Sequence, residues 1–317
     1  MTYAQFGTVQ ATDFNTLAGG NPTTTSGTLN AVWATGGGAA GYGQTALSNV
    51  TAGQTVAATT QWATLVANTS SAASHQGSSI TAVTAPVAGG TITYLSAIPT
   101  NLTTIYTNRL NAATQGSTSA NTATTAATWS DKATFTHTAT FANGDAARYF
   151  FNSGGQLKIT MSHPTGTGIN LLLNNLASNV GTVVQSAPAS GTISVAATSY
   201  NGITKVGGGG NAPTISQNSG YYAMTTANAN VFYQTASTGP SGYLSTNINI
   251  FIKSNGTQGS NSDAGSVITI YTVWDEIPNG LTVASGSAVT VTAQAPETTY
   301  LANSWGTITL AGSVAVV

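Results

Sequence analysis

Three histidines are the side chains in this sequence best suited to bind a metal or to move protons near neutral pH. His75, His137 and His163 stand far apart, and none has an acidic residue at metal-ligand spacing. The chain has no cysteine, so thiolate ligands and disulfides are excluded. We therefore predict structural histidines, no metal and no cofactor.

Asp275 and Glu276 are the one adjacent acidic pair in the sequence. Adjacent residues of a strand point to opposite faces, so these two are poorly placed as the carboxylates of a glycosidase. We expect both at a strand end as solvated charge, and a pair of non-adjacent acids stays open. No G-x-S-x-G nucleophile motif occurs either. The sequence thus predicts a protein that is not an enzyme.

Residues 36–41, Gly-Gly-Gly-Ala-Ala-Gly, match the G-x-G-x-x-G pattern of dinucleotide-binding loops. No strand is predicted before them. The next acid is Asp131, whereas a ribose partner is expected about 20 residues after the glycines. The chain has 36 glycines, so chance accounts for the match. We predict a loop that binds no nucleotide.

The stretch FANGDAARYFFNSGGQLKIT, residues 141–160, places one arginine among aromatic side chains. A buried charge without a partner is strongly destabilising, so we expect Arg148 to pair with Asp145 or with a backbone carbonyl. We predict a strand that ends at Phe151, a glycine-containing turn and a returning strand. The residues of this predicted structural motif are Arg148, Asp145, Tyr149, Phe150, Phe151, Asn152, Gly154 and Gly155.

Charged residues make up only 4% of the 317 residues, against about 25% in a typical soluble domain. Lys and Arg number 6 and Asp and Glu number 7, so the net charge is -1. Without a basic surface, we predict no nucleic-acid partner and no attachment to an anionic membrane. The 41% apolar content favours a folded chain. A surface without charge repulsion suits packing against copies of the same protein.

Membrane-spanning and targeting segments are not expected. No run of about 18 apolar residues occurs. The first ten residues, MTYAQFGTVQ, have no basic region and no apolar core, so they do not predict a signal peptide.

Helical spacing dominates the N-terminal third of the chain. The sequence predicts a short helix in TSGTLNAVWAT, a helix from Gln54 to His75 stopped by Gly77, and a second long helix from Pro99. ATDFNTLAGG is interpreted as a turn that begins at an aspartate. We assign residues 1–113 to a helical docking domain and residues 114–128, rich in Ser, Thr and Ala, to a linker.

Apolar residues then alternate with polar ones, which is typical of half-buried strands. This pattern occurs in ATFTHTATF, QLKITM, TNINIFIK, SVITIYTVW, AVTVTA and GTITLAGSVAVV. INLLLNNLASNV instead has helical spacing. We predict an α+β protein in which a small N-terminal helical unit precedes an antiparallel β-sandwich, residues 129–317, that carries one inserted helix.

ARYFFNSGGQLKIT resembles a motif in uncharacterised virion structural proteins of tailed bacteriophages, cyanophages and other myophages among them. LNAVWATGGGAAGYGQ, QWATLV and ASHQG resemble the leading part of the same kind of protein. The resemblance spans about half of the chain and marks no catalytic site. It implies a virion component at the tail, baseplate, neck or fibres.

We therefore expect a non-enzymatic structural component of a tailed-phage virion, which assembles from copies of itself and contacts other virion proteins. The helical part would dock to the particle or to sister chains, and the sandwich would project or tile. A capsid decoration or collar protein is the first alternative. The others are a module that binds host glycans through Tyr and Trp, and a polysaccharide-degrading enzyme, which the scarcity of acids disfavours.

Overall fold

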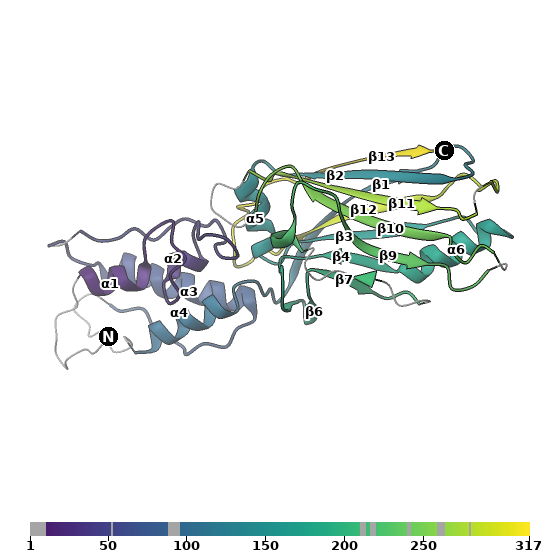
Figure 1. Cartoon of the computed structure of the whole chain (residues 1–317). Coiled ribbons are helices and arrows are strands. Elements are labelled where there is room, and N and C mark those ends of the chain that lie inside the picture. The colour runs from purple at the N-terminus through teal and green to yellow at the C-terminus, as the bar shows by residue number, and fades with distance from the viewer. Residues whose placement is uncertain are drawn as a thin grey trace.

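A helical unit and a β-sandwich lie end to end in the computed structural model of the chain (Figure 1). The structure describes residues 11–51, 53–87, 96–209, 214–215, 220–239, 242–258, 264–278 and 280–317. Residues 1–10, for which no signal peptide is predicted, lie outside these ranges. Within them, no helix has the length and apolar character needed to cross a membrane. The arrangement confirms the predicted α+β fold class.

The helical unit contains α1 (Ala11–Ala18), α2 (Leu29–Val32), α3 (Ala63–Gln76), which a π-helical turn (Ala58–Trp62) precedes, and α4 (Ala97–Thr107). α3 ends at Gly77, whose φ of 69° permits the left-handed stop that the sequence predicts. α1 corrects the predicted turn in ATDFNTLAGG. Phe14, Leu17 and Ala18 lie at helical spacing and are buried, and Phe14 meets the edge of Trp62 with ring centroids 5.3 Å apart.

Two antiparallel sheets form the sandwich, and the strand order is β1-β12-β3-β4-β7 in one sheet and β13-β2-β11-β10-β9-β8 in the other. A separate hairpin pairs β5 with β6. The strands are β1 (Gln115–Thr124), β2 (Lys132–Thr140), β3 (Gln156–Ser162), β4 (Thr182–Gln185), β5 (Ile193–Val195), β6 (Thr198–Tyr200), β7 (Ile203–Val206), β8 (Thr214–Ile215), β9 (Ala229–Thr235), β10 (Asn247–Ser254), β11 (Val267–Asp275), β12 (Ala288–Pro296) and β13 (Thr309–Val316).

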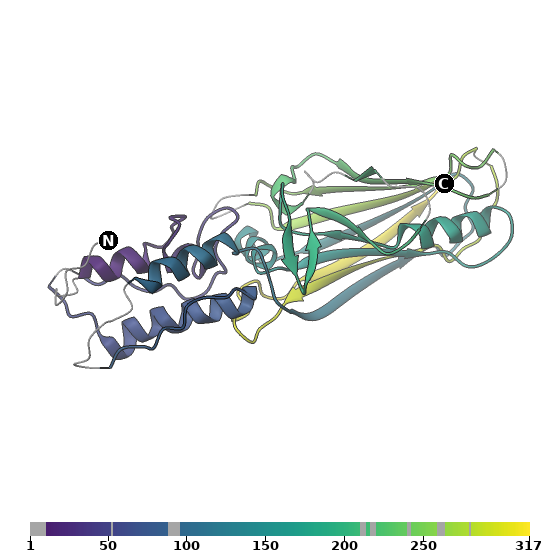
Figure 2. The same ribbon diagram turned by 90° about the horizontal axis from the view of Figure 1, so that it is seen from below.

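The period-two patterns place apolar side chains between the sheets. On β2, Phe135 and His137 are buried, while Thr134, Thr136 and Thr138, which alternate with them, are partly exposed. β10 and β11 repeat this alternation with their isoleucines. The inserted helix α6 (Ile169–Val180) buries Leu172, Leu173 and Leu176 against the core at the end of the sandwich remote from the helical unit (Figure 2). The helix predicted in INLLLNNLASNV is confirmed.

The predicted linker at residues 114–128 is wrong for most of its length, because Gln115–Thr124 forms β1. β1 pairs antiparallel with β12, for example Ala123 opposite Val289. It is an edge strand, and most of its side chains are exposed. Backbone pairing holds such a strand in place without apolar alternation, so its polar composition resembles that of a linker.

The predicted strand and hairpin around Arg148 are also wrong, because Gly144–Asn152 forms helix α5. The side chain of Asn143 caps the helix by accepting the N–H of Ala146 at 2.8 Å. Ala146, Ala147, Phe150 and Phe151 are buried at the three- and four-residue steps of a helix. The strand β3 does follow the glycines, as predicted, and Gly154 has a φ of 84°.

Candidate functional site

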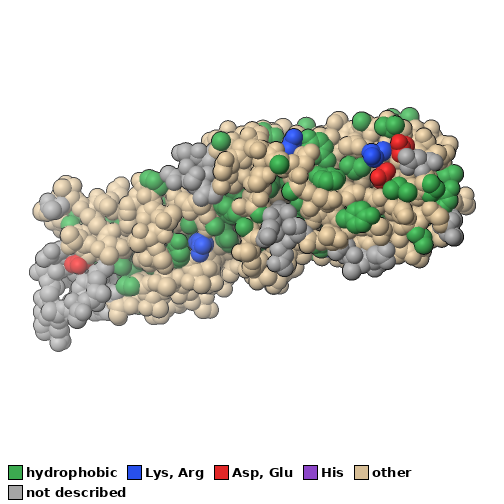
Figure 3. Space-filling view, viewed as in Figure 1, with side chains coloured by type: hydrophobic (Ala, Val, Ile, Leu, Met, Phe, Trp, Pro, Cys, Tyr) green, Lys and Arg blue, Asp and Glu red, His purple; other side chains and the backbone are tan. Residues whose placement is uncertain are grey.

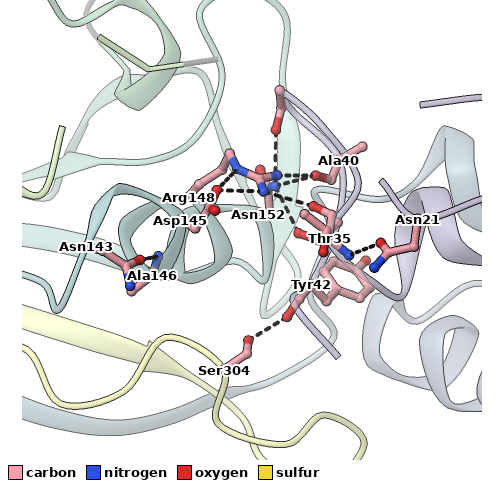
Figure 4. A network of polar contacts seen from close by, with 12 residues as sticks. Asn21, Thr35, Ala40, Tyr42, Asn143, Asp145, Ala146, Arg148, Asn152 and Ser304 are labelled. Atoms are coloured by element: carbon pink, nitrogen blue, oxygen red, sulfur yellow. Dashed lines mark hydrogen bonds and ion pairs between the residues drawn. The ribbon is translucent and has the colours of Figure 1, made fainter. Parts of the chain in front are cut away.

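Arg148 lies at the junction between the two parts of the molecule and is fully buried. Its guanidinium donates to the carbonyl oxygens of Ala40 at 2.8 Å and Thr35 at 2.9 Å, both in the loop that follows α2. It also donates to Asp145 Oδ1 through Nε at 3.1 Å and Nη2 at 2.9 Å. Figure 4 shows these contacts converging on one guanidinium. The partners are the acid and the backbone carbonyls that the sequence names as candidates.

Asn152, one turn further along α5, binds the same loop. Its Nδ2 donates to the carbonyl oxygens of Ala40 and Gly41, each at 3.0 Å, and to that of Gly38 at 3.3 Å. The hydroxyl of Tyr222 donates to the Gly38 oxygen at 2.7 Å and lies 2.5 Å from Asn152 Oδ1. Side chains of the sandwich therefore satisfy a series of loop carbonyls that would otherwise be buried without donors.

Arg109 binds this loop from the helical side. Its Nε donates to the Ala39 oxygen at 2.5 Å, and its Nη1 donates to the Tyr106 oxygen at 2.8 Å. Arg109 and Arg148 are the chain's two arginines. Both therefore donate hydrogen bonds to carbonyl oxygens of residues 35–41, which we call the junction loop.

Glycines permit close contacts within the junction loop and, just after it, between the chain and the sandwich. Gly41 has a φ of 93°, and a Cβ there would collide with the backbone of Thr35. Gly43 has a φ of 69°, and a Cβ there would collide with the ring of Tyr149. The glycines of the G-x-G-x-x-G match thus present backbone carbonyls to protein donors. A nucleotide phosphate would need N–H donors instead.

The remaining residues of the predicted motif anchor α5 to the sandwich. Phe150 and Phe151 are fully buried, and the ring of Phe151 stacks on Tyr221 at 4.4 Å between centroids. Tyr149 carries the Arg148 guanidinium over its ring at 4.8 Å from the centroid. Gly155 packs against Phe150, where a Cβ would overlap the ring and the carbonyl oxygen. The apolar face of α5 therefore packs into the sandwich, and its polar face binds the junction loop.

A second buried polar contact joins the two parts. His75 Nδ1, in the last turn of α3, lies 2.9 Å from Glu297 Oε1, just after β12, and both side chains are almost fully buried. Burial raises the pKa of Glu297. The hydrogen bond from His75, those from the N–H groups of Thr299 and Tyr300, and the charge of His75 outweigh burial, so the pKa is lowered overall. The two residues are 222 positions apart, so sequence spacing alone could not reveal this pair.

The segment between β12 and β13 runs back into the helical unit. Leu301 is 1% exposed and belongs to the hydrophobic core of the helices. Gln44 and Ala302 exchange hydrogen bonds of 2.8 and 2.9 Å, and Ser304 donates to the Tyr42 oxygen at 2.5 Å (Figure 4). A C-terminal segment therefore completes an N-terminal core, and its contacts with the helical unit hold the two parts together.

His163 lies in a Ser-His-Asn arrangement that could suggest nucleophilic catalysis. Its Nδ1 is 2.9 Å from Ser287 Oγ and its Nε2 is 3.0 Å from Asn170 Oδ1. However, Ser287 is 0% exposed, His163 is 3% exposed, and Trp129 Nε1 donates to Ser287 Oγ at 3.3 Å. Burial lowers the pKa of His163, although the hydrogen bond to Asn170 opposes this effect. A substrate has no access to this serine, and the arrangement fits a structural histidine.

Glu276 corrects the prediction of a solvated acidic pair. Asp275 does end β11, but Glu276 is 0% exposed, and its Oε2 accepts the N–H of Gly280 at 3.0 Å. Burial raises the pKa of Glu276, and the nearby Asp131 and Asp275 add to this effect, while hydrogen bonds from Leu281 and Gly280 oppose it. The turn after β11 folds back over this carboxylate, and sequence adjacency gave no sign of that.

Within the described ranges, no group of three His, Asp or Glu side chains could hold a metal ion. A cavity of about 370 Å³ lies beside β1 and the segment that follows β12, and uncharged residues line it. No protein-family model, no curated protein and no solved structure matches the chain. The junction is therefore the best-defined cluster of interacting polar side chains among the described residues.

Proposed function

We propose that this protein is a non-enzymatic structural component of a tailed-phage virion. The junction is the observation that carries the proposal. Arg148, paired with Asp145, and the His75–Glu297 pair fasten the helical unit to the sandwich in a chain with very few charges, and Arg109 holds the junction loop from the helical side. A buried charge that loses its partner is strongly destabilising, so these pairs favour the geometry in which both partners meet. A virion component that must hold its two ends in fixed orientation needs such a junction.

The surface supports self-assembly. Few charged side chains occur on the face shown in Figure 3, which is mostly uncharged polar and backbone surface with scattered apolar side chains. With a net charge of -1, copies of the chain do not repel one another strongly. We propose that the helical unit docks to the particle or to sister chains, and that the sandwich projects or tiles. The position could be the tail, baseplate, neck or fibres, or a capsid decoration or collar.

Mass spectrometry of density-purified virions, together with immunogold labelling, tests this proposal. We expect peptides of the chain at a fixed ratio to other virion proteins, with gold at one morphological position. A lysate that contains the protein while the purified particles lack it would contradict the proposal. Labelling on the capsid or collar would select the decoration alternative.

A glycan-binding role remains the second candidate because three aromatic residues share one sheet face. Phe251 on β10 lies directly opposite Tyr271 on β11, and Tyr233 on β9 lies opposite Asn249, two residues from Phe251. Tyr233 is 36% exposed. However, Lys253 Nζ lies 5.5 Å from the centroid of Tyr271 and covers part of that ring. Aromatic rings of this kind stack on sugars.

A glycan array followed by calorimetry with Tyr233→Ala tests this second role. Binding that the substitution weakens at least about tenfold would support it. An array without hits would reject it and would leave the structural proposal intact.

A further inference from the structure

The outer edge of β13 presents unpaired backbone groups along a full strand. Val317 N–H donates to the Lys132 oxygen at 2.9 Å, and the Val317 oxygen accepts the N–H of Asp131 at 3.2 Å. The backbone of Val317 therefore faces β2. Since the direction alternates along an antiparallel strand, the N–H and C=O groups of four residues face outward, namely Leu310, Gly312, Val314 and Val316.

β1 does not cover this outer edge. A Cβ on Gly312 would meet Asn121 of β1 and His137 of β2, so β1 lies against the inner face of β13. Figure 1 shows β13 as the outermost strand along one side of the sandwich. Among the residues that the structure describes, no hydrogen bond reaches the outward backbone groups of β13.

The other sheet edges carry features that discourage pairing with another chain. β8 has 2 residues, and β7 has 4 and includes Lys205. β1 has a break in register between Gln115 and Thr118. Short strands, lysines and bulges are the usual protection of an edge. β13, with sequence TLAGSVAV, has 8 residues and contains no charge, no proline and no bulge.

We propose that β13 pairs with β13 of a second copy about a two-fold axis, which joins the two six-stranded sheets into one continuous sheet. This inference rests on the self-assembly that we propose above, and it identifies the surface through which two copies associate. An antiparallel edge is complementary to its own copy because a two-fold axis brings each outward N–H to an outward C=O. The edge carries no charge that would oppose such a contact or select a charged partner.

The direction of the backbone groups fixes the register. Outward residues must face outward residues, and the overlap that uses all of them places Leu310 opposite Val316 and Gly312 opposite Val314 of the second copy. Ser313 then lies on the axis opposite itself, in a pair that is not hydrogen-bonded. Ala311 lies opposite Ala315 of the second copy. Ala311, Ser313 and Ala315 are exposed in the single chain.

The first test is a single cysteine in a chain that has none. In the proposed register the two Ser313 Cα atoms are about 4.5 Å apart, which a disulfide can span. We expect Ser313→Cys to form, under mild oxidation, a covalent dimer of twice the 31.7 kDa chain mass. Ser199→Cys, on the exposed strand β6, is the control and should stay monomeric. Equal cross-linking of both variants, or of neither, would overturn the proposal.

A charge pattern tests the register independently. Ala311→Lys with Ala315→Lys places lysines opposite each other across the axis, and we expect dimerisation at least about tenfold weaker by sedimentation velocity. Ala311→Lys with Ala315→Glu places opposite charges together and should retain the dimer. Both pairs of side chains face solvent in the single chain, so circular dichroism should match that of the parent.

The outcomes separate the two proposals. A parent that assembles while both charge variants assemble equally well overturns the β13 contact and leaves self-assembly standing. A parent that remains monomeric at every concentration overturns the β13 contact and also counts against self-assembly in solution.

Discussion

Arg148 shows how one buried cation can organise the junction between two parts of a chain. The residue donates hydrogen bonds to two loop carbonyl oxygens and to one carboxylate at the same time. Its planar guanidinium suits this role because it donates in several directions from a fixed plane. Asp145, in the first turn of α5, is stabilised both by Arg148 and by the positive end of the helix.

Arg148→Ala is expected to lower the free energy of unfolding by about 3 kcal/mol, because it removes the donor to the Thr35 carbonyl, one of the two donors to the Ala40 carbonyl, and the cation paired with Asp145. Arg148→Lys should lower it by less, since lysine restores the charge without the planar fork. Chemical denaturation measures both. Lys205→Ala on the partly exposed strand β7 is the control and should change stability by no more than about 0.5 kcal/mol. Two Arg148 variants as stable as the parent would show that the junction does not depend on this residue.

Gly43→Ala should destabilise the protein for two reasons, the positive φ of 69° and a collision of the new Cβ with Tyr149. Gly53→Ala is a matched control, because Gly53 has a φ of 86° and no atom within 4 Å of the added Cβ. The difference between their melting temperatures isolates the collision. Tyr149→Ala should relieve that collision in the double variant. Equal decreases in melting temperature for Gly43→Ala and Gly53→Ala would mean that the backbone at Gly43 does not lie close against the ring of Tyr149.

The ionised side chains of two buried glutamates should change the free energy of unfolding in opposite directions. Glu297 has a folded pKa below its ordinary value of 4.5, so it stabilises the fold above that pH, and this contribution is lost as the pH falls through the folded pKa. Glu276 has a raised pKa, so its ionised form costs stability as the pH rises beyond 4.5. We expect Glu297→Gln to lower and Glu276→Gln to raise the melting temperature at neutral pH. Both differences should shrink in acid, and a constant difference for either variant would argue against its pKa shift.

At the scale of secondary structure, the sequence predicts the helices and strands whose apolar pattern is strong. The helices α3, α4 and α6 and the strands β2, β3, β10, β11, β12 and β13 all occur where that periodicity places them. β1 was missed because an exposed edge strand needs no apolar face. α5 was missed because its cap, Asn143, and its following glycines resemble the ends of a hairpin strand. Apart from the Arg148–Asp145 pair, which the sequence does suggest, the contacts that join the two parts link residues over 100 positions apart, so local pattern could not reveal them.

The position of β1 revises the expected boundary of the sandwich. A fragment that begins at residue 114 keeps β1 on β12, whereas one that begins at residue 125 exposes the edge of β12. We expect both to fold and the longer fragment to melt at a higher temperature in circular dichroism. Both should melt below the full chain, because Leu301 loses the helical core that buries it. Equal melting temperatures for the two fragments would mean that β1 adds nothing to the sandwich.

At the scale of the whole molecule, the helical unit and the sandwich each have a hydrophobic core, yet the junction loop and the segment after β12 cross between them. The result is an elongated body with the helices at one end and the sandwich at the other (Figure 2). Such a body can transmit a fixed orientation from one neighbour in an assembly to the next. The low content of charged residues supports the proposed packing against copies of the same chain.

Cryo-electron microscopy of the intact particle tests the central claim most directly. We predict density into which the whole chain fits as one rigid body, with its helical unit toward the particle and its sandwich outward or beside a sister sandwich. A particle map in which all density is accounted for by other proteins would contradict the account. Density that fits the two parts only after the junction is broken would contradict the rigid connection on which the account depends.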